Sequence, residues 1–298
     1  RDSGVDPVLT AANILSIEGE DVYEVLIGDY LDGLGGHSSQ YATSKVKTAL
    51  GNYESTTEGG WLVQGVDPLD DCRPMNWVRF KPDNPRKNYK KPGKVIKYES
   101  PRGSTSRATF LNGPWKIGLK VARKAGLQED YEKRFEVFCQ NHPNQAFDPD
   151  SKKAKKDHLE SIDKDFWLWV KNNSQVSVCL TEGEKKSGAL LSLGFAAIGL
   201  PGINSGYRTK DRLKNPIKPF LIPEVELFTA QDRTIYIIFD QEIELRKQFR
   251  VQGAIRKLGG LLKKGLADVR IVEWLPEFDK GIDDFLVSQG QERVTETI

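Results

Sequence analysis

Three carboxylates of this chain stand just beyond two apolar segments. Glu182 follows Val176–Leu180, and Asp240 and Glu242 follow Thr234–Phe239. If both segments are strands of one parallel sheet, these acids converge on one rim, where open α/β sheets place their ligands. Carboxylates at positions i and i+2 of an extended segment project to the same side, and Mg²⁺ prefers such oxygens. We therefore expect Mg²⁺, or Mn²⁺ in its place, at Asp240 and Glu242, with Glu182 as a ligand or proton carrier.

A purely structural role explains the same residues. Asp240 can cap the helix that follows its strand. An acid such as Glu182, placed before a helix N-terminus, commonly interacts with the helix dipole. The spacing of the acids by itself leaves both roles open.

Two lysines and a glycine stand near the acids in the sequence. Lys185 and Lys186 lie in the first turn of the predicted helix Glu184–Leu193, where cations oppose the helix dipole. Such a pair indicates a phosphate ligand, although plain solvent exposure explains it equally well. Gly202, in the turn after the next apolar run, lets the backbone approach a ligand closely.

A pattern typical of α/β proteins positions these residues. Val176–Leu180, the helix Glu184–Leu193 and Ala196–Leu200 form a strand–helix–strand unit, which implies a parallel pair of strands. Two further apolar runs, Thr234–Phe239 and Val269–Trp274, predict strands, and residues 248–262 between them predict a helix. We therefore expect a Rossmann-like parallel sheet flanked by helices in residues 161–298.

Residues 1–160 predict a different kind of region. The first 50 residues favour helices at 6–13, 21–31 and 44–50. Further on, Gly, Pro and aromatic residues punctuate four short β-like runs, which are Gly60–Val63, Asn76–Phe80, Val95–Tyr98 and Ala108–Leu111. Residues 118–126 and 129–140 predict helices, and residues 141–158 predict a polar linker that contains the basic run Lys152–Lys156.

The segment Arg79–Arg102 is strongly basic, with nine cations and two acids among 24 residues and hence a net charge of +7. Aromatic residues interleaved with the cations suit a groove for single-stranded nucleic acid, in which phosphates meet cations and bases stack on rings. The cations to which we assign this role are Arg79, Lys81, Arg86, Lys87, Lys90, Lys91, Lys94 and Lys97. The alternative is a solvated basic loop whose aromatic side chains fill the core of a β-rich region.

Composition narrows the class of protein. The 298 residues are 38% hydrophobic and 29% charged, which suits one large or two ordinary globular domains. No apolar run approaches the ~20 residues that cross a bilayer. The three cysteines are widely separated and no CxxC pair exists, so we expect neither a zinc ribbon nor a disulfide framework, and we expect a cytoplasmic location. A P-loop is also missing, and the start at Arg1 suggests a fragment of a longer protein.

Several motifs together resemble the toprim domain of primases and topoisomerases, and more closely the toprim-like domain of large replication proteins from plasmids and phages. The core motifs are LTEGE at Leu180–Glu184, LPG at Leu200–Gly202 and FDQE at Phe239–Glu242. The replication proteins share TEGEKK and a late KGIDD motif, here Lys280–Asp284. They also share an FKPDNPR-like segment, here Phe80–Arg86, a K-Y-E-x-P segment, here Lys97–Pro101, and the opening Asp2-Ser3-Gly4. The resemblance covers nearly the whole chain.

The resemblance implies a role for each matching residue. Glu182 would act as general acid/base or ligand and Asp240 as a Mg²⁺ ligand, while Glu242 stands where the wider toprim family has a second Asp. Asp283 or Asp284 would add a late acidic metal site, with Lys280 near phosphate. Lys185 departs from the acid that bacterial primases carry there, and their zinc-binding module is lacking.

The function implied is that of a DNA-replication protein fragment, a toprim-type primase that transfers nucleotides with Mg²⁺. Its partners would be single-stranded or primed DNA, nucleotides and a helicase domain in the same full-length chain. Two alternatives stay open. One is a toprim nuclease, which uses the same carboxylates with water as the nucleophile. The other is a non-catalytic nucleic-acid-binding module of a replicative helicase–primase.

Overall fold

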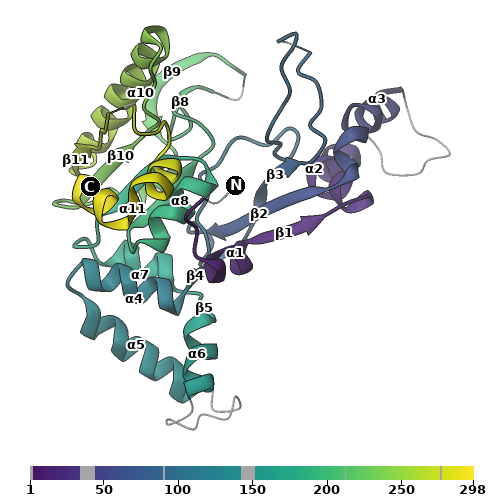
Figure 1. Ribbon diagram of the computed structural model, residues 1–298. Helices are drawn as coiled ribbons and strands as arrows, with labels where there is room; N and C mark the ends of the chain where they lie inside the picture. The colour runs from purple at the N-terminus through teal and green to yellow at the C-terminus, as the bar shows by residue number, and fades with distance from the viewer. Residues whose placement is uncertain (1–2, 34–43, 90, 142–151, 212, 276) are drawn as a thin grey trace. The chain divides into compact units, whose positions relative to one another are not determined.

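The computed structural model describes residues 3–33, 44–89, 91–141, 152–211, 213–275 and 277–298 (Figure 1). The chain forms two compact units. The first holds residues 1–12, 66–73 and 107–298, and the second holds residues 13–65 and 74–106. The boundary expected at residue 160 thus lies inside the first unit, because residues 107–160 pack with the segment that follows them. Among the described residues, no helix is long and apolar enough to span a membrane.

A four-stranded parallel sheet forms the centre of the first unit. Its strands are β6 (Val178–Glu182), β7 (Ala196–Leu200), β10 (Thr234–Ile238) and β11 (Asp268–Ile271), in the spatial order β11-β10-β6-β7. Each predicted apolar run therefore forms a parallel strand, and the expected α/β class is confirmed. Every residue of β7 is buried although the strand lies at one end of the sheet, because strands of a parallel sheet are covered on both faces and so read as continuous apolar runs.

Helices connect and cover these strands (Figure 1). Helix α8 (Glu184–Ser192) links β6 to β7 and packs on both, and α10 (Leu245–Lys264) links β10 to β11. Helix α11 (Ile282–Thr297) packs against α8. Gly183 caps α8 with a φ of 93°, a left-handed conformation that glycine adopts without steric cost. This sharp turn lets β6 end and α8 begin within one residue.

The remaining elements of the first unit are mostly helical. They are α1 (Pro7–Asn13), β4 (Gly113–Pro114), α4 (Trp115–Lys124), α5 (Gln128–Asn141), α6 (Lys152–Glu160), β5 (Ile162–Asp163), α7 (Phe166–Asn172), β8 (Tyr207–Lys210), β9 (Pro216–Leu221) and α9 (Pro223–Glu226). The polar linker expected at residues 141–158 is therefore wrong in its last part, where α6 forms. Lysine is a good helix former, so a polar composition there does not exclude a helix. Residues 142–151 lie outside the described part of the chain.

The second unit joins two helices to a three-stranded sheet. Its elements are β1 (Ile14–Ile17), α2 (Glu20–Asp32), α3 (Ser44–Tyr53), the 3₁₀ helix η2 (Glu54–Glu58), β2 (Gly60–Asp67) and β3 (Arg73–Pro82), and the strand order is β1-β2-β3. The strands at β2 and β3 and the helices at α2 and α3 were predicted. Apolar side chains of both helices and of β2 and β3 form one buried core, which includes Leu26, Tyr53, Leu62 and Phe80.

Two predicted strands are wrong. Residues 95–98 contribute only an isolated bridge between Lys87 and Val95, and residues 108–111 only a bridge between Thr109 and Gly199. Pro82, Pro85 and Pro92 lie in or beside the first pairing and offer no backbone donor. In the second segment the amide of Ala108 donates to the side chain of Glu224, so it is not available to a strand ladder.

Candidate functional site at the sheet rim

The order of the strands creates a switch point between β6 and β10. From β6 the chain continues to β7 on one side, and later returns to β10 on the other side. The loops that leave β6 and β10 therefore diverge from each other at their C-terminal ends, which is where open α/β sheets form a ligand crevice. Thr181 pairs with Ile238 in the parallel register, so Glu182 and Asp240 leave the sheet at the same rim. The predicted convergence of these two acids is thereby explained by the topology.

Lys186 is the cation at the centre of this rim. Its ammonium lies 3.0 Å from Asp240 Oδ1, and both side chains are largely buried, with 19% and 15% of their surface exposed. Burial alone lowers the pKa of Lys186, but Asp240, Asp283 and Glu182 outweigh it and raise the pKa above its ordinary value. A Cβ on Gly281 would lie 2.6 Å from Asp283 Oδ1 and 2.7 Å from Lys186 Cε. Only glycine leaves room there for the lysine to reach the acids.

Lys280 is a second cation at the rim, supplied by the loop before α11. Its ammonium lies 2.8 Å from Glu242 Oε1 and 3.9 Å from Asp240 Oδ2. The amide of Gln241 donates to the carbonyl of Lys280, so this loop is attached to the loop that follows β10. The two predicted metal ligands are thus close enough to share one positive charge.

Glu182 lies among these charges with an altered acidity. Burial raises the pKa of Glu182, the carboxylates of Asp240 and Glu242 raise it further, and Lys186 and Lys280 oppose them. The first two causes prevail, so the side chain is a weaker acid than usual. A carboxyl group whose pKa is shifted towards neutrality suits proton transfer.

A pocket of about 470 Å³ opens beside the rim, and Glu182 and Glu242 both line it. The turn after β7 forms another wall through Gly202 and residues 203–205. A Cβ on Gly202 would lie 3.9 Å from Glu182 Oε1, so the missing side chain keeps the acid accessible. Lys247 and Arg250 of α10 complete the wall. Glu242 also borders a neighbouring pocket of about 460 Å³, which extends towards β11.

The other predicted residues of the first unit are placed as follows. Asp283 and Asp284 lie in the first turn of α11, and Asp283 is 8% exposed and faces Lys186. Lys185 is half-buried and makes no ion pair with any residue that the structure describes. The rim therefore brings together Glu182, Lys186, Asp240, Glu242 and Lys280, with Gly202 and Asp283 at its borders.

The oxygen donors of the rim fit a hard cation. Within the described ranges, no group of three or more His, Cys, Asp or Glu side chains is arranged to hold a metal ion alone. Mg²⁺ in phosphate-handling sites is commonly held by one or two carboxylates, with waters and substrate phosphates as the other ligands. Asp240 and Glu242 provide such a pair. The ammonium of Lys280 lies within reach of both carboxylates and so occupies the position that a bound cation would take. Its side chain is 55% exposed, so it can turn away from the acids without loss of buried contacts.

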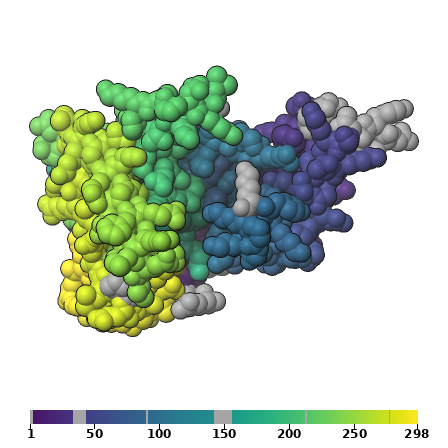
Figure 2. Space-filling model, turned by 90° about the horizontal axis from the view of Figure 1, so that it is seen from above, coloured from purple at the N-terminus to yellow at the C-terminus, as the bar shows by residue number. Residues whose placement is uncertain are grey.

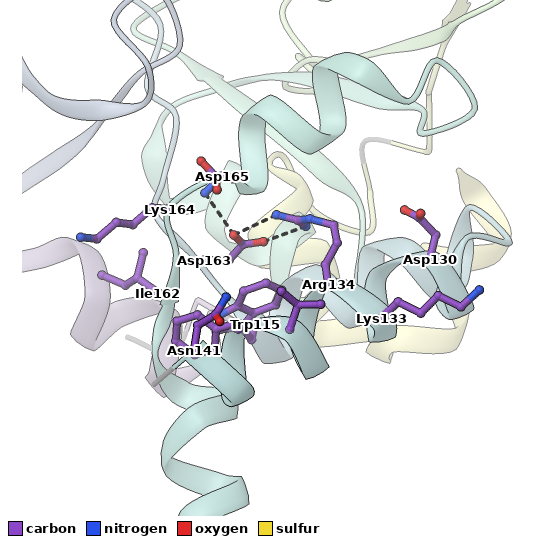
Figure 3. Close-up of a pocket in the computed structure, with 11 residues that line it drawn as sticks. Trp115, Asp130, Lys133, Arg134, Asn141, Ile162, Asp163, Lys164 and Asp165 are labelled. Carbon is purple, nitrogen blue, oxygen red and sulfur yellow. Dashed lines mark hydrogen bonds and ion pairs between the residues drawn. The ribbon is translucent and has the colours of Figure 1, made fainter. Parts of the chain in front are cut away.

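Figure 3 shows a different pocket of the first unit, of about 580 Å³, lined by α5 and the residues around β5. Arg134 pairs with both carboxylate oxygens of Asp163 at 3.1 and 3.2 Å, and the amide of Asp165 donates to the same carboxylate. Tyr131 donates a further hydrogen bond to Asp163. Because partners within the protein satisfy this buried acid, we interpret the cluster as structural.

The basic segment belongs to the second unit, and part of its charge is used internally. Arg86 forms a bidentate pair with Glu99 at 2.6 and 3.0 Å. Arg79 donates to Ser100 and lies over the ring of Tyr98. These two cations therefore stabilise the fold. Trp77 and Phe80, two of the rings expected among the cations, are buried in the unit.

Other cations of this segment reach solvent. The exposed side chains are those of Lys81, Lys87, Lys91, Lys94 and Lys97, whereas Lys90 lies outside the described residues. Tyr89 is 77% exposed, so one ring of the segment is open to stack against a partner. The described cations of the segment that can contact a polyanion are thus Lys81, Lys87, Lys91, Lys94 and Lys97.

Sequence reasoning missed the contribution of α10 to the site. Residues 248–262 were predicted only as a helix, whereas Lys247 and Arg250 line the rim pocket. The available signal was the charge of the helix, because its 20 residues include seven cations and no acid. Asn204 was missed as well, and nothing in its position distinguishes it from an ordinary turn residue.

Comparisons with known proteins give a matching family and a similar protein, and neither has a described function. Residues 166–293, which contain the parallel sheet and the rim, match a family described as Domain of unknown function (DUF3854). The chain is 34% identical over 292 residues to an uncharacterized protein of Picosynechococcus sp., an alignment that covers 97% of this chain. The chain spans about a quarter of the length of that protein, 25%. No solved structure matches the chain.

Proposed function

We propose that this chain is part of a DNA-replication protein and carries a toprim-type primase centre, which transfers nucleotides onto nucleic acid with Mg²⁺. The observation that carries the proposal is the arrangement of the rim. Glu182, Asp240 and Glu242 meet at the switch point of a parallel sheet, and two lysines are paired with them. The motifs that resemble toprim replication proteins supply these same residues.

Each residue of the rim has a defined task in this proposal. Asp240 and Glu242 would hold Mg²⁺, which when bound neutralises the charge of a triphosphate. Glu182 takes the proton of the attacking hydroxyl, as the new phosphodiester bond forms and pyrophosphate leaves. Its raised pKa suits that transfer near neutral pH. Lys280 moves from Glu242 to the substrate phosphates, while Lys186 stays with Asp240 and fixes its orientation.

A nuclease would use the same rim. In that reaction water replaces the hydroxyl as the nucleophile, and Glu182 takes a proton from water. The phosphodiester bond is broken and no nucleotide is added. The same carboxylates would hold the cation, so the two reactions differ in their products.

A non-catalytic module is the second candidate, and one observation favours it. Both Asp240 and Glu242 already have a lysine within 3.0 Å, so the charges of these two carboxylates are balanced without a metal. In this alternative the ion pairs only stabilise the switch point, and the protein binds nucleic acid to anchor a helicase.

The experiment uses the wild-type protein and Asp240→Ala with a template strand, all four nucleotides and Mg²⁺ or Mn²⁺, and it follows extension and cleavage together. We expect extension by the wild type and its loss in Asp240→Ala, with nucleic acid binding retained. The control is Glu292→Ala, which removes an exposed acid of α11, ten residues after the helix begins at Ile282. Loss of cleavage instead of extension would indicate the nuclease. A wild type that binds strands without either reaction would indicate the non-catalytic module.

A further inference from the structure

Helix α10 is the most one-sided charged element of the first unit. Its 20 residues, Leu245–Lys264, contain seven cations and no acid. Among the described residues, only Lys247 of this helix has an acidic partner, Glu244 at 2.7 Å. The other cations of the helix are Arg246, Arg250, Arg256, Lys257, Lys263 and Lys264, and all of these are exposed. Such a density of like charge is unfavourable for an isolated helix, so it indicates a polyanionic partner.

Three of these cations form a stripe along the helix. Arg246, Arg250 and Lys257 are spaced by four and seven residues, so they fall on one side at 3.6 residues per turn. The opposite side is buried through residues such as Ala254, Leu258 and Leu262. The stripe therefore faces solvent over about 17 Å, at a rise of about 1.5 Å per residue.

The β8–β9 hairpin, residues 207–221, extends this basic surface. Its base packs on α10, since a Cβ on Gly206 would lie 3.1 Å from Leu258 Cδ1, and Lys257 lies over the ring of Tyr207. The hairpin carries four described cations, Arg208, Lys210, Lys214 and Lys218, against one acid, Asp211. Figure 2 shows the yellow-green surface of α10 next to the green surface of the hairpin.

Exposed rings accompany the cations on both elements. Phe249 of α10 is 67% exposed and stands next to Arg250 in the sequence, and Phe220 of the hairpin is 46% exposed. Rings beside cations are the combination with which proteins bind single strands, because bases stack on the rings while phosphates contact the cations. A purely acidic protein segment would use the cations and leave the rings in water.

The stripe leads to the rim. Arg250 lines the pocket of about 470 Å³ that also contains Glu182 and Glu242. A polymer bound along α10 therefore has a continuous path from Lys257 through Arg250 into the site.

We propose that single-stranded nucleic acid binds along α10 and the β8–β9 hairpin, with phosphates on Arg246, Arg250 and Lys257 and a base against Phe249. The strand then enters the rim pocket between Arg250 and Glu182. This inference deepens the proposed function. It rests on that proposal for the identity of the polymer, a nucleic acid. It adds a binding surface in the first unit, separate from the basic segment of the second.

The experiment measures binding of a labelled single-stranded oligonucleotide by fluorescence anisotropy between about 50 and 200 mM salt. Replacing Arg246, Arg250 and Lys257 by Ala should weaken binding and lower the slope of log affinity against log salt by roughly 2, at about 0.7 per phosphate contact. A charge-preserving variant with Lys, Lys and Arg at these positions should retain the wild-type slope. Circular dichroism checks that each variant is folded.

Two matched variants localise the effect. One replaces Lys133, Lys164 and Lys171, three exposed cations of the same unit, by Ala. It removes equal charge and should leave the slope nearly unchanged. The other replaces Lys87, Lys91 and Lys94 of the second unit by Ala and measures the share of binding that belongs to the basic segment.

Phe249→Ala should weaken binding of the oligonucleotide about tenfold, since each base stacked on a ring contributes substantially to affinity, and should leave binding of polyglutamate unchanged.

Equal losses for the α10 variant and its matched control would overturn the inference. So would tighter binding of polyglutamate than of the oligonucleotide, which would assign the surface to an acidic protein. Binding carried wholly by Lys87, Lys91 and Lys94 would overturn it too and leave the proposed function standing. A wild type that binds no nucleic acid would refute both.

Discussion

Replacing Lys186 by Met tests the electrostatics of the rim. The change keeps an unbranched apolar side chain of similar length and removes the ammonium that lies 3.0 Å from Asp240 Oδ1. Of the cations paired with Asp240 in the described part of the chain, Lys280 at 3.9 Å would then remain. Removing one partner of a buried pair destabilises a protein because the other charge stays buried without compensation.

The expected loss of stability lies between two limits. Two unit charges 3.0 Å apart attract each other by about 5.5 kcal/mol at an effective dielectric constant of about 20, and desolvation offsets part of this. Breaking a fully buried pair costs about 3–5 kcal/mol, whereas exposed pairs contribute less than about 1 kcal/mol. Lys186 and Asp240 are 19% and 15% exposed and Lys280 remains, so we expect a loss of about 2 kcal/mol.

The sign of the pH dependence follows from the pKa of Lys186, which is raised in the folded protein. A raised lysine pKa contributes stability that is fully present below the unfolded value of 10.5 and is lost as the pH rises through the folded value. The difference between the wild type and Lys186→Met should therefore be constant near neutral pH and shrink in alkali.

The assay is urea unfolding at pH 7 with and without Mg²⁺, at matched ionic strength. Mg²⁺ should stabilise Lys186→Met more than the wild type, because the charge of Asp240 is then uncompensated until a cation binds. A site with a Kd of about 1 mM would return about 1.4 kcal/mol at about 10 mM Mg²⁺. Lys185→Met is the matched control and should be neutral. Equal stability of the two variants would refute the ion-pair argument, and equal Mg²⁺ effects would refute the cation site.

Two further predictions concern buried charges. Glu182→Gln should be more stable than the wild type at pH 7, because a raised carboxyl pKa means that the folded state disfavours the ionised form. This gain in stability should vanish as the pH falls below the ordinary glutamate pKa of 4.5. Thermal melts of both proteins between pH 7 and that value measure the gain, and a gain that persists at low pH would contradict the reasoning. Arg233 is fully buried and donates to the carbonyls of Val170, Lys171 and Val176 at 2.8–2.9 Å. Arg233→Met should therefore cost about 3 kcal/mol in urea unfolding, and a loss below about 1 kcal/mol would show that water replaces the guanidinium.

The parallel sheet could be predicted from sequence because its signal is local. Runs such as Ala196–Leu200 are buried on both faces, and a strand buried in this way must be apolar throughout. The two segments wrongly predicted as strands lack that constraint. Ala108 belongs to one of them, and its amide bonds to the distant side chain of Glu224, a contact that no local pattern reveals.

The candidate site could be predicted in part. Glu182, Asp240 and Glu242 were found because each follows a strand, and parallel topology brings strand ends together. The pairing of Lys186 and Lys280 with these acids depends on which strands are neighbours and on the fold of the loop before α11. Periodicity carries neither kind of information. The positive charge of α10 can be read from the sequence. That this charge lies beside the rim pocket follows only from the packing of the helix.

The central claim is that Asp240 and Glu242 hold a divalent cation at the switch point. Electron paramagnetic resonance of Mn²⁺ measures this most directly, by titrating free Mn²⁺ with the wild type and with Asp240→Ala, each with and without a nucleoside triphosphate. The account predicts that the wild type binds Mn²⁺ in the presence of the triphosphate, that Mg²⁺ displaces it, and that Asp240→Ala weakens binding at least about tenfold. Equal Mn²⁺ binding by the wild type and Asp240→Ala would contradict the claim.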